Sequence, residues 1–223
     1  APGRCKRAEI TITHPVIPPP QTAPFPVVPA EGYWLPIGFA WHLLDANAYI
    51  LEHRLEPLIE GTVHPSAVVE GPLRLGKNSV IRSGVVIEGP VCIGDNCVVG
   101  PNAYLRPGTT LGNGCKVGQA CELKNTILFD GAHVPHLSYV GDSVIGAKAN
   151  LGAGTITANL RHDGKPIASA IKGVLVDSGR RKFGAIVGDG VHTGINTSIL
   201  PGRKLWPGTG TEPGAVVRRD VTE

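Results

Sequence analysis

The amino-acid sequence predicts an all-β fold, a left-handed parallel β-helix, and three observations lead to it. Aliphatic or aromatic residues recur at every sixth position from Val63 to Phe129 without a gap. A small residue, such as Ala67, Cys97 or Thr109, often follows four positions after the apolar one. The 223 residues include 30 Gly and 20 Pro but only 5% aromatic residues, which indicates many tight turns around a narrow interior.

Each six-residue unit of such a fold forms one short strand and one turn, and three units complete a triangular coil of about 18 residues. The repeat slips after Val140, returns at Ile145 and Leu151, stops over about residues 158–184, and resumes from Val187 to Val217. A segment without the repeat must leave the prism. We therefore expect a β-helix domain over residues 61–223 with a loop at about 158–184.

Two segments of different character precede the repeat. Residues 1–38 are rich in Pro, which excludes a continuous helix or an inner strand and predicts an extended arm. Apolar residues spaced by three or four from Trp41 to Leu55 predict a helix that ends before Pro57. We interpret residues 39–60 as a helix that caps the first coil, followed by a linker.

Composition excludes several classes of protein. There is no Gly-X-Y period, no apolar run approaches the ~20 residues of a membrane span, and the net charge of +3 does not favour nucleic acid. The five Cys are an odd number without a Cys-x-x-Cys pair, which favours a reducing, cytoplasmic setting. Cys97, Cys115 and Cys121 fall on the small inward position, so we expect buried structural thiols.

Charged residues at outer positions form the first candidate for chemistry. Arg106 and Lys124 lie 18 residues apart, one full coil, and should stack on the same edge of the prism. Two adjacent cations repel each other unless an anion lies between them. Two solvated surface charges are the alternative.

The second candidate is His136, which lies close to Tyr139 and Asp142 where the repeat slips. It follows Pro135 and should project outward, whereas His133 falls on the small inward position and should be buried. A neutral imidazole can take a proton from an amine under acyl transfer. A structural histidine is the alternative.

Two further segments offer groups for a ligand. Asn150 precedes Gly152-Ala153-Gly154, whose backbone N–H groups could hold an oxyanion. The cluster Arg180-Arg181-Lys182 follows Ser178-Gly179 and suits phosphate, with a solvated charge run as the alternative. The expected loop also supplies Asn159, Arg161 and Lys165.

Four motifs resemble the acetyltransferase half of bifunctional sugar-1-phosphate nucleotidylyltransferase/acetyltransferases, and the long loop resembles that of archaeal-type members. They begin at Leu105-Arg106, Glu122-x-Lys124, His136 and Asn150. The resemblance covers about residues 33–221. It implies a homotrimer that transfers acetyl from acetyl-CoA to an amino-sugar 1-phosphate, either glucosamine-1-phosphate or galactosamine-1-phosphate, in nucleotide-sugar biosynthesis, without a metal.

The resemblance also implies roles for single residues. His136 matches the general base, and the N–H of Ala153 matches a position beside the thioester. Arg180 and Arg181 become candidates for the phosphates of acetyl-CoA. The positions that match sugar-phosphate contacts are Arg106, Lys124, Tyr139, Asn150, Asn159, Lys165 and Lys182.

Two departures and two rival interpretations accompany this hypothesis. Residues 31–47 resemble only the last strand and helix of the nucleotidyltransferase domain. Residues 1–38 are therefore interpreted as what is left of that domain, either because the chain is a fragment or because its first half was lost naturally, and we expect no nucleotidyl transfer. Ala168 stands where archaeal-type members carry a lysine. One rival is a non-catalytic β-helix that trimerises or regulates a nucleotidylyltransferase. The other is a zinc carbonic anhydrase, in which three histidines converge between subunits, here His133, His136 and His192.

Overall fold

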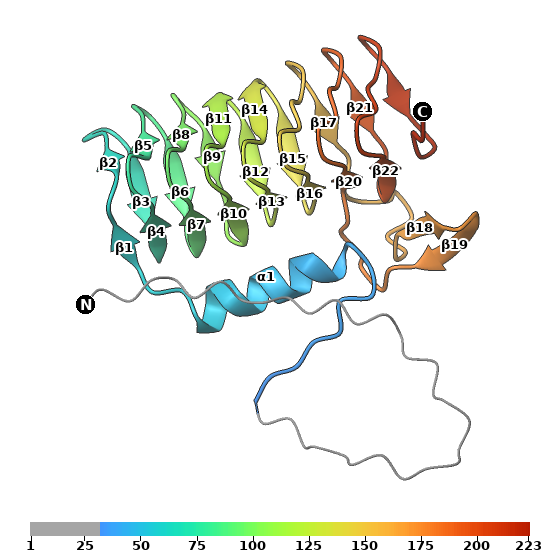
Figure 1. Ribbon diagram of the computed structural model, residues 1–223, viewed down its shortest axis with the longest axis horizontal. Helices are drawn as coiled ribbons and strands as arrows, with labels where there is room; N and C mark the ends of the chain where they lie inside the picture. The colour runs from blue at the N-terminus through green and yellow to red at the C-terminus, as the bar shows by residue number, and fades with distance from the viewer. Residues whose placement is uncertain (1–31) are drawn as a thin grey trace.

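A computed structural model describes residues 32–223, and it confirms the predicted all-β parallel β-helix. Three parallel sheets form the sides of a prism whose axis runs horizontally in Figure 1. The predicted arm over residues 1–38 lies outside the described residues as far as residue 31.

The coils contribute short strands to three sides of the prism, and the later coils continue the second side through isolated bridges at Asn150, His192 and Gly210. Sheet A contains eight strands: β1 (Leu58–Ile59), β4 (Leu73–Leu75), β7 (Val91–Ile93), β10 (Thr109–Leu111), β13 (Ile127–Leu128), β16 (Val144–Ile145), β20 (Ala185–Val187) and β22 (Arg203–Leu205). Sheet B contains five: β2 (Thr62–Val63), β5 (Val80–Ile81), β8 (Val98–Val99), β11 (Lys116–Gln119) and β14 (His133–His136). Sheet C contains eight: β3 (Val68–Glu70), β6 (Val86–Glu88), β9 (Tyr104–Leu105), β12 (Glu122–Lys124), β15 (Tyr139–Gly141), β17 (Ile156–Thr157), β21 (Ser198–Ile199) and β23 (Val216–Val217).

The inward aliphatic residues form the core of the prism. Leu111 of sheet A, Val117 of sheet B and Leu123 of sheet C, from successive hexads, are each at most 1% exposed. Burial of such a side chain stabilises the fold by roughly 1.5–3 kcal/mol. Cys97, Cys115 and Cys121 are buried as expected, and a main-chain carbonyl accepts a hydrogen bond from each thiol.

The repeat shortens earlier than its sequence pattern indicates. Leu111 pairs with Leu128, and Leu128 pairs with Ile145, so these coils contain 17 residues. Leu128 is 1% exposed and Phe129 is 42% exposed, so the expectation that Phe129 points inward is wrong. Five residues separate Leu123 from Leu128, where six separate Leu105 from Leu111, and Asn125 turns this shorter corner with a φ of 46°.

The same shift corrects the placement of His133. Ala132 occupies the small inward position and is fully buried. His133 lies in β14 on the outer side of sheet B, half-buried, with Lys116 opposite it on the preceding coil. Burial lowers the pKa of His133, and the positive charge of Lys116 adds to this effect.

The helix α1 (His42–His53) falls within the range 39–55, but it does not cap the first coil. It runs along sheet A, parallel to the prism axis (Figure 1). Trp41 and Leu44 pack in a second core with Ile127 and Val144, which face outward from sheet A. Asn47 donates to the carbonyl of Gly108 at 2.8 Å and accepts from the Thr110 hydroxyl. The apolar stripe of the helix therefore covers the side of the prism.

The segment expected as a loop over about 158–184 contains a hairpin. Its strands β18 (Ala168–Ile171) and β19 (Val174–Asp177) pair antiparallel. Ile167, just before β18, and Phe183, near the end of the segment, join the second core beside α1. No helix in the part of the chain that the structure describes is long and apolar enough to cross a membrane.

The corrected register predicts different effects of two neighbouring substitutions. Leu128→Ala should lower the free energy of unfolding by about 2–5 kcal/mol, because it leaves a cavity in the prism. Phe129→Ala should lower it by less than about 1 kcal/mol, because that ring is exposed. Denaturant unfolding of both variants checks this. A larger loss of unfolding free energy in Phe129→Ala than in Leu128→Ala would show that Phe129, and not Leu128, points inward.

Candidate active site

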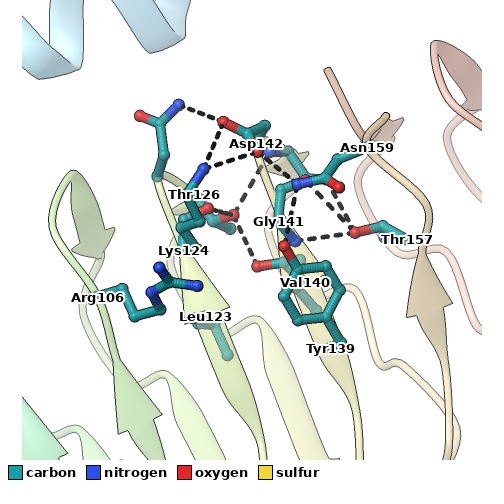
Figure 2. Close-up of polar contacts among 12 residues, drawn as sticks. Arg106, Leu123, Lys124, Thr126, Tyr139, Val140, Gly141, Asp142, Thr157 and Asn159 are labelled. Atoms are coloured by element: carbon teal, nitrogen blue, oxygen red, sulfur yellow. Dashed lines mark hydrogen bonds and ion pairs between the residues drawn. The ribbon is translucent and has the colours of Figure 1, made fainter. Parts of the chain in front are cut away.

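The first candidate site lies where sheet C turns toward sheet A, and Asp142 is at its centre. Lys124 Nζ lies 3.2 Å from Asp142 Oδ2 and 3.4 Å from Oδ1. Asn125 and Asn159 donate to the same carboxylate at 2.8 Å and 2.6 Å. The carboxylate is only 3% exposed and Lys124 is 20% exposed, so this pair is fixed and largely shielded from solvent. Figure 2 shows these side chains pointing toward one another.

Tyr139 joins this cluster through Asn159. The Asn159 amide donates to the Tyr139 hydroxyl at 2.9 Å, and the ring lies over Gly141, where an added Cβ would be 2.4 Å from the hydroxyl. Burial raises the pKa of Tyr139, so the phenol is protonated at neutral pH. Within residues 32–223 its hydrogen has no acceptor, so it can donate to a ligand.

Arg106 lies one coil before Lys124 on the same edge, as the 18-residue spacing predicts. Its Nη1 donates to Glu122 at 2.9 Å, and its guanidinium lies 5.6 Å from the centre of the Tyr104 ring. Its Nε is buried and has no hydrogen-bond partner in the described chain. An unpaired buried donor is costly, and a ligand or a second chain would satisfy it.

The two cations are not an unopposed pair, because Glu122 pairs with Arg106 and Asp142 pairs with Lys124. The four groups together carry no net charge. Sequence reasoning did not assign these roles to the carboxylates. The 17-residue coil made Asp142 hard to find, because it places Gly141 beside Lys124 and Asp142 at the corner.

The second candidate site lies at the opposite edge of sheet C, where sheet B turns into it. His136 ends β14 and is exposed, and in residues 32–223 its imidazole has no hydrogen-bond partner. The pairing of His133 with Asn150 continues along the chain, so Ala153 lies beside His136 on the next coil. The N–H of Gly154 donates to the His136 carbonyl at 3.1 Å, which ties the two coils together.

Only one N–H of the Gly152-Ala153-Gly154 segment is available to a ligand. The N–H of Gly152 donates to Thr193, and that of Gly154 is used by His136. The N–H of Ala153 has no acceptor in the described chain. This corner therefore combines a solvent-facing imidazole with one unpaired backbone donor.

Asn150 lies on the outer side of sheet B, between His133 and His192 on the neighbouring coils. It is three residues before Ala153 and therefore borders the His136 corner.

No group of three His, Cys, Asp or Glu that could hold a metal occurs among residues 32–223. His136 ends the strand that His133 begins, so the three histidines of the zinc hypothesis do not converge within this chain.

The basic residues of the 158–184 segment do not form one cluster. Arg180 forms an ion pair with Asp45 of α1, which neutralises its charge. Arg181 and Lys182 are exposed, and Lys182 pairs with Leu160 beside Asn159. Lys165 is exposed in a turn, where its N–H donates to Asp163. The neck of the segment thus brings Lys182 toward the Asp142 cluster, whereas within residues 32–223 no contact joins Lys165 to that cluster.

One chain therefore contains two separate half-sites. His136 precedes β15, Asp142 follows it, and the described residues contain no contact between His136 and the Asp142 cluster. Side chains at different corners of a prism point in different directions. Chemistry that needs both half-sites requires two chains side by side.

Comparisons with known proteins identify relatives of this chain. Residues 87–205 match the family model described as the GMPPB C-terminal domain. The chain is 42% identical over 195 residues to a bifunctional sugar-1-phosphate nucleotidylyltransferase/acetyltransferase of Sulfurisphaera tokodaii, covering 87% of this chain and 49% of that protein. It is 49% identical over 193 residues to a bifunctional protein GlmU of Methanococcus maripaludis, covering 86% and 46%.

Among solved structures, PerB from Caulobacter crescentus in complex with CoA and GDP-perosamine overlaps 73% of this chain and 51% of that chain. The TM-score is 0.32 and the identity 23%, too low to carry an argument about function. The chain spans about half the length of the curated relatives that it matches. Because the family model covers more than half of its residues, the chain belongs to the GMPPB C-terminal domain family, and its relatives include bifunctional sugar-1-phosphate nucleotidylyltransferase/acetyltransferases.

Proposed function

We propose that this chain forms a homotrimeric N-acetyltransferase that moves an acetyl group from acetyl-CoA to the amine of an amino-sugar 1-phosphate. Glucosamine-1-phosphate and galactosamine-1-phosphate are the first candidate acceptors. The observation that carries the proposal is that the unused N–H of Ala153 lies on the coil next to His136, at the same corner of the prism. A base and an oxyanion donor are the minimum that acyl transfer to an amine requires.

The chemistry assigns one task to each of these two groups. The ammonium group of the acceptor first releases one proton to solvent. The free amine then attacks the thioester carbonyl, a C–N bond forms, and His136 accepts the second proton that the nitrogen loses. The N–H of Ala153 donates to the carbonyl oxygen as its negative charge develops. The C–S bond then breaks, the thiolate leaves, and the imidazolium of His136 returns its proton to the sulfur.

The Asp142 cluster is suited to an acceptor that carries both signs of charge. Arg106 and Lys124 keep unused N–H donors for a phosphate, while Glu122 and Asp142 balance their charges. An amino-sugar phosphate presents an anionic and a cationic group at neutral pH, which fits a cluster of zero net charge. The Tyr139 hydroxyl adds a neutral donor, and Asn159 fixes its position.

The separation of the two half-sites supports an oligomer, and the resemblance to the acetyltransferase family implies that it is a trimer. We propose that His136 and Ala153 of one chain face Arg106, Lys124 and Tyr139 of the next. A buried Arg106 Nε without a partner in the single chain supports an interface or ligand at this edge. Arg181 is exposed and remains a candidate for the phosphates of acetyl-CoA, whereas Arg180 is engaged by Asp45. Lys182 is exposed beside Asn159 and remains a candidate for the sugar phosphate.

Release of free thiol from acetyl-CoA tests the function directly. We expect turnover with glucosamine-1-phosphate or galactosamine-1-phosphate, and little with glucosamine, because the unphosphorylated sugar cannot use Arg106 and Lys124. The thiol is measured with a chromogenic disulfide, and the acetylated product by mass spectrometry. A folded trimer that releases no thiol with any phosphorylated amino sugar would favour the non-catalytic alternative.

Kinetics of single variants test the assigned roles. His136→Ala should lower kcat by about 10²–10⁴-fold with a smaller change in the acceptor KM, because proton transfer is lost while the phosphate contacts remain. Arg106→Ala should mainly raise the acceptor KM. His53→Gln, on the exposed side of α1, is the matched control and should behave as wild type. A folded His136→Ala trimer with nearly unchanged kcat contradicts the base assignment.

A further inference from the structure

A pocket outside the candidate active site has a strongly basic lining. It lies between the base of the β18–β19 hairpin and the last two coils of the prism, at the right of Figure 1, and has a volume of about 250 Å³. This volume equals that of about eight water molecules in the liquid. Three arginines and an apolar wall line it: Arg161, Arg203, Arg218, Ile167, Leu200 and Pro201.

The guanidinium of Arg203 is fixed without a counter-charge. Its Nε donates to the Pro201 carbonyl at 3.2 Å, and its Nη2 donates to the Ala168 carbonyl at 3.0 Å. No carboxylate of the described chain pairs with it. Two backbone carbonyls thus hold this cation in place at the pocket and leave its Nη1 for a ligand.

The other two arginines add to this positive charge. Arg161 is held by Asp163, which accepts from Nε at 2.9 Å and Nη2 at 2.7 Å, so its Nη1 remains unused. Arg218 is exposed and has no partner within residues 32–223. With Asp163 included, the lining carries two positive charges in excess.

Asp220, two residues after Arg218, does not neutralise this excess positive charge. Asp220 lies 2.8 Å from Lys204 Nζ, and it also accepts from the Lys204 N–H. It is therefore committed to a neighbouring cation. Fixed guanidinium groups with free N–H donors bind phosphoryl oxygens well, because their planar donor geometry matches two oxygens of one group.

The register places this pocket on the same edge of the prism as Lys124. The outer position after each inward residue of sheet C is occupied in turn by Lys124, Gly141, Ala158, Leu200 and Arg218. Four coil steps of about 4.8 Å separate Lys124 from Arg218, or about 19 Å. The pocket is thus separate from the Asp142 cluster, but one elongated molecule could reach both.

We infer that this pocket binds a phosphoryl group of an organic phosphate, with the apolar wall against the organic part. Two sources carry this chemistry: the phosphates of CoA bound by the same trimer, and a separate phosphate compound. Binding of the CoA phosphates rests on the proposed function, whereas binding of a separate phosphate compound does not.

Binding of inorganic pyrophosphate, measured by calorimetry on the full chain, tests the inference. Arg218→Gln should weaken the binding of pyrophosphate about tenfold, because the loss of one hydrogen bond to a charged group has about this effect. Arg218 is exposed and lacks intrachain partners, so the fold should be unaffected, and thermal melting checks this. Arg219→Gln is the matched control, because Arg219 is exposed and does not line the pocket. Unchanged affinity in Arg218→Gln, or equal losses in both variants, overturns the inference.

The same variants distinguish the two sources. If CoA supplies the phosphoryl group, Arg218→Gln should weaken the binding of CoA about tenfold, and Arg219→Gln should leave it unchanged. A smaller effect on dephospho-CoA would identify the 3′-phosphate. If Arg218→Gln weakens the binding of pyrophosphate but not the binding of CoA, the pocket serves a separate phosphate compound. Wild-type protein that transfers no acetyl group but shows the Arg218-dependent loss would refute the proposed function and leave the pocket standing.

Discussion

The coil-to-coil hydrogen bonding of the prism determines where every outer side chain lies. Backbone groups of one coil pair with those of the next, so residues at equal positions are stacked about 4.8 Å apart. The inward aliphatic residues fix the register, because a slip of one residue would exchange the core for the surface. Chemistry on this scaffold therefore arises in columns along the edges, as Arg106, Lys124 and Arg218 show.

The repeat allowed the fold and the Arg106–Lys124 stack to be predicted from the sequence. The register beyond Leu123 could not be predicted from the sequence. Leu128 and Phe129 are both apolar, so either of them could occupy the next inward position. The structure decides between them by the pairing of Leu111 with Leu128. The helix was predictable from its periodicity, but its location was not. Ile127 and Val144, which receive it, become neighbours only once the 17-residue coil is known.

The same shortened coils build the Asp142 cluster. A coil of 17 residues sets Gly141 beside Lys124 and turns Asp142 to the corner, where Lys124, Asn125 and Asn159 surround it. Sequence spacing pointed to two cations that need an anion. The structure supplies two carboxylates of its own and a network of zero net charge. This difference changes the expected ligand from a simple anion to a molecule that carries both charges.

The central claim is that one catalytic centre combines His136 of one chain with Lys124 of another. Mixed trimers of His136→Ala and Lys124→Met chains, refolded together in equal amounts and assayed for thiol release at low acceptor concentration, test it most directly. With random assembly about a quarter of the shared sites receive both intact residues, so activity should rise to about a quarter of wild type although each parent trimer is nearly inactive. Activity no higher than the mean of the two parents would contradict the shared site, since a centre within one chain cannot be restored by mixing.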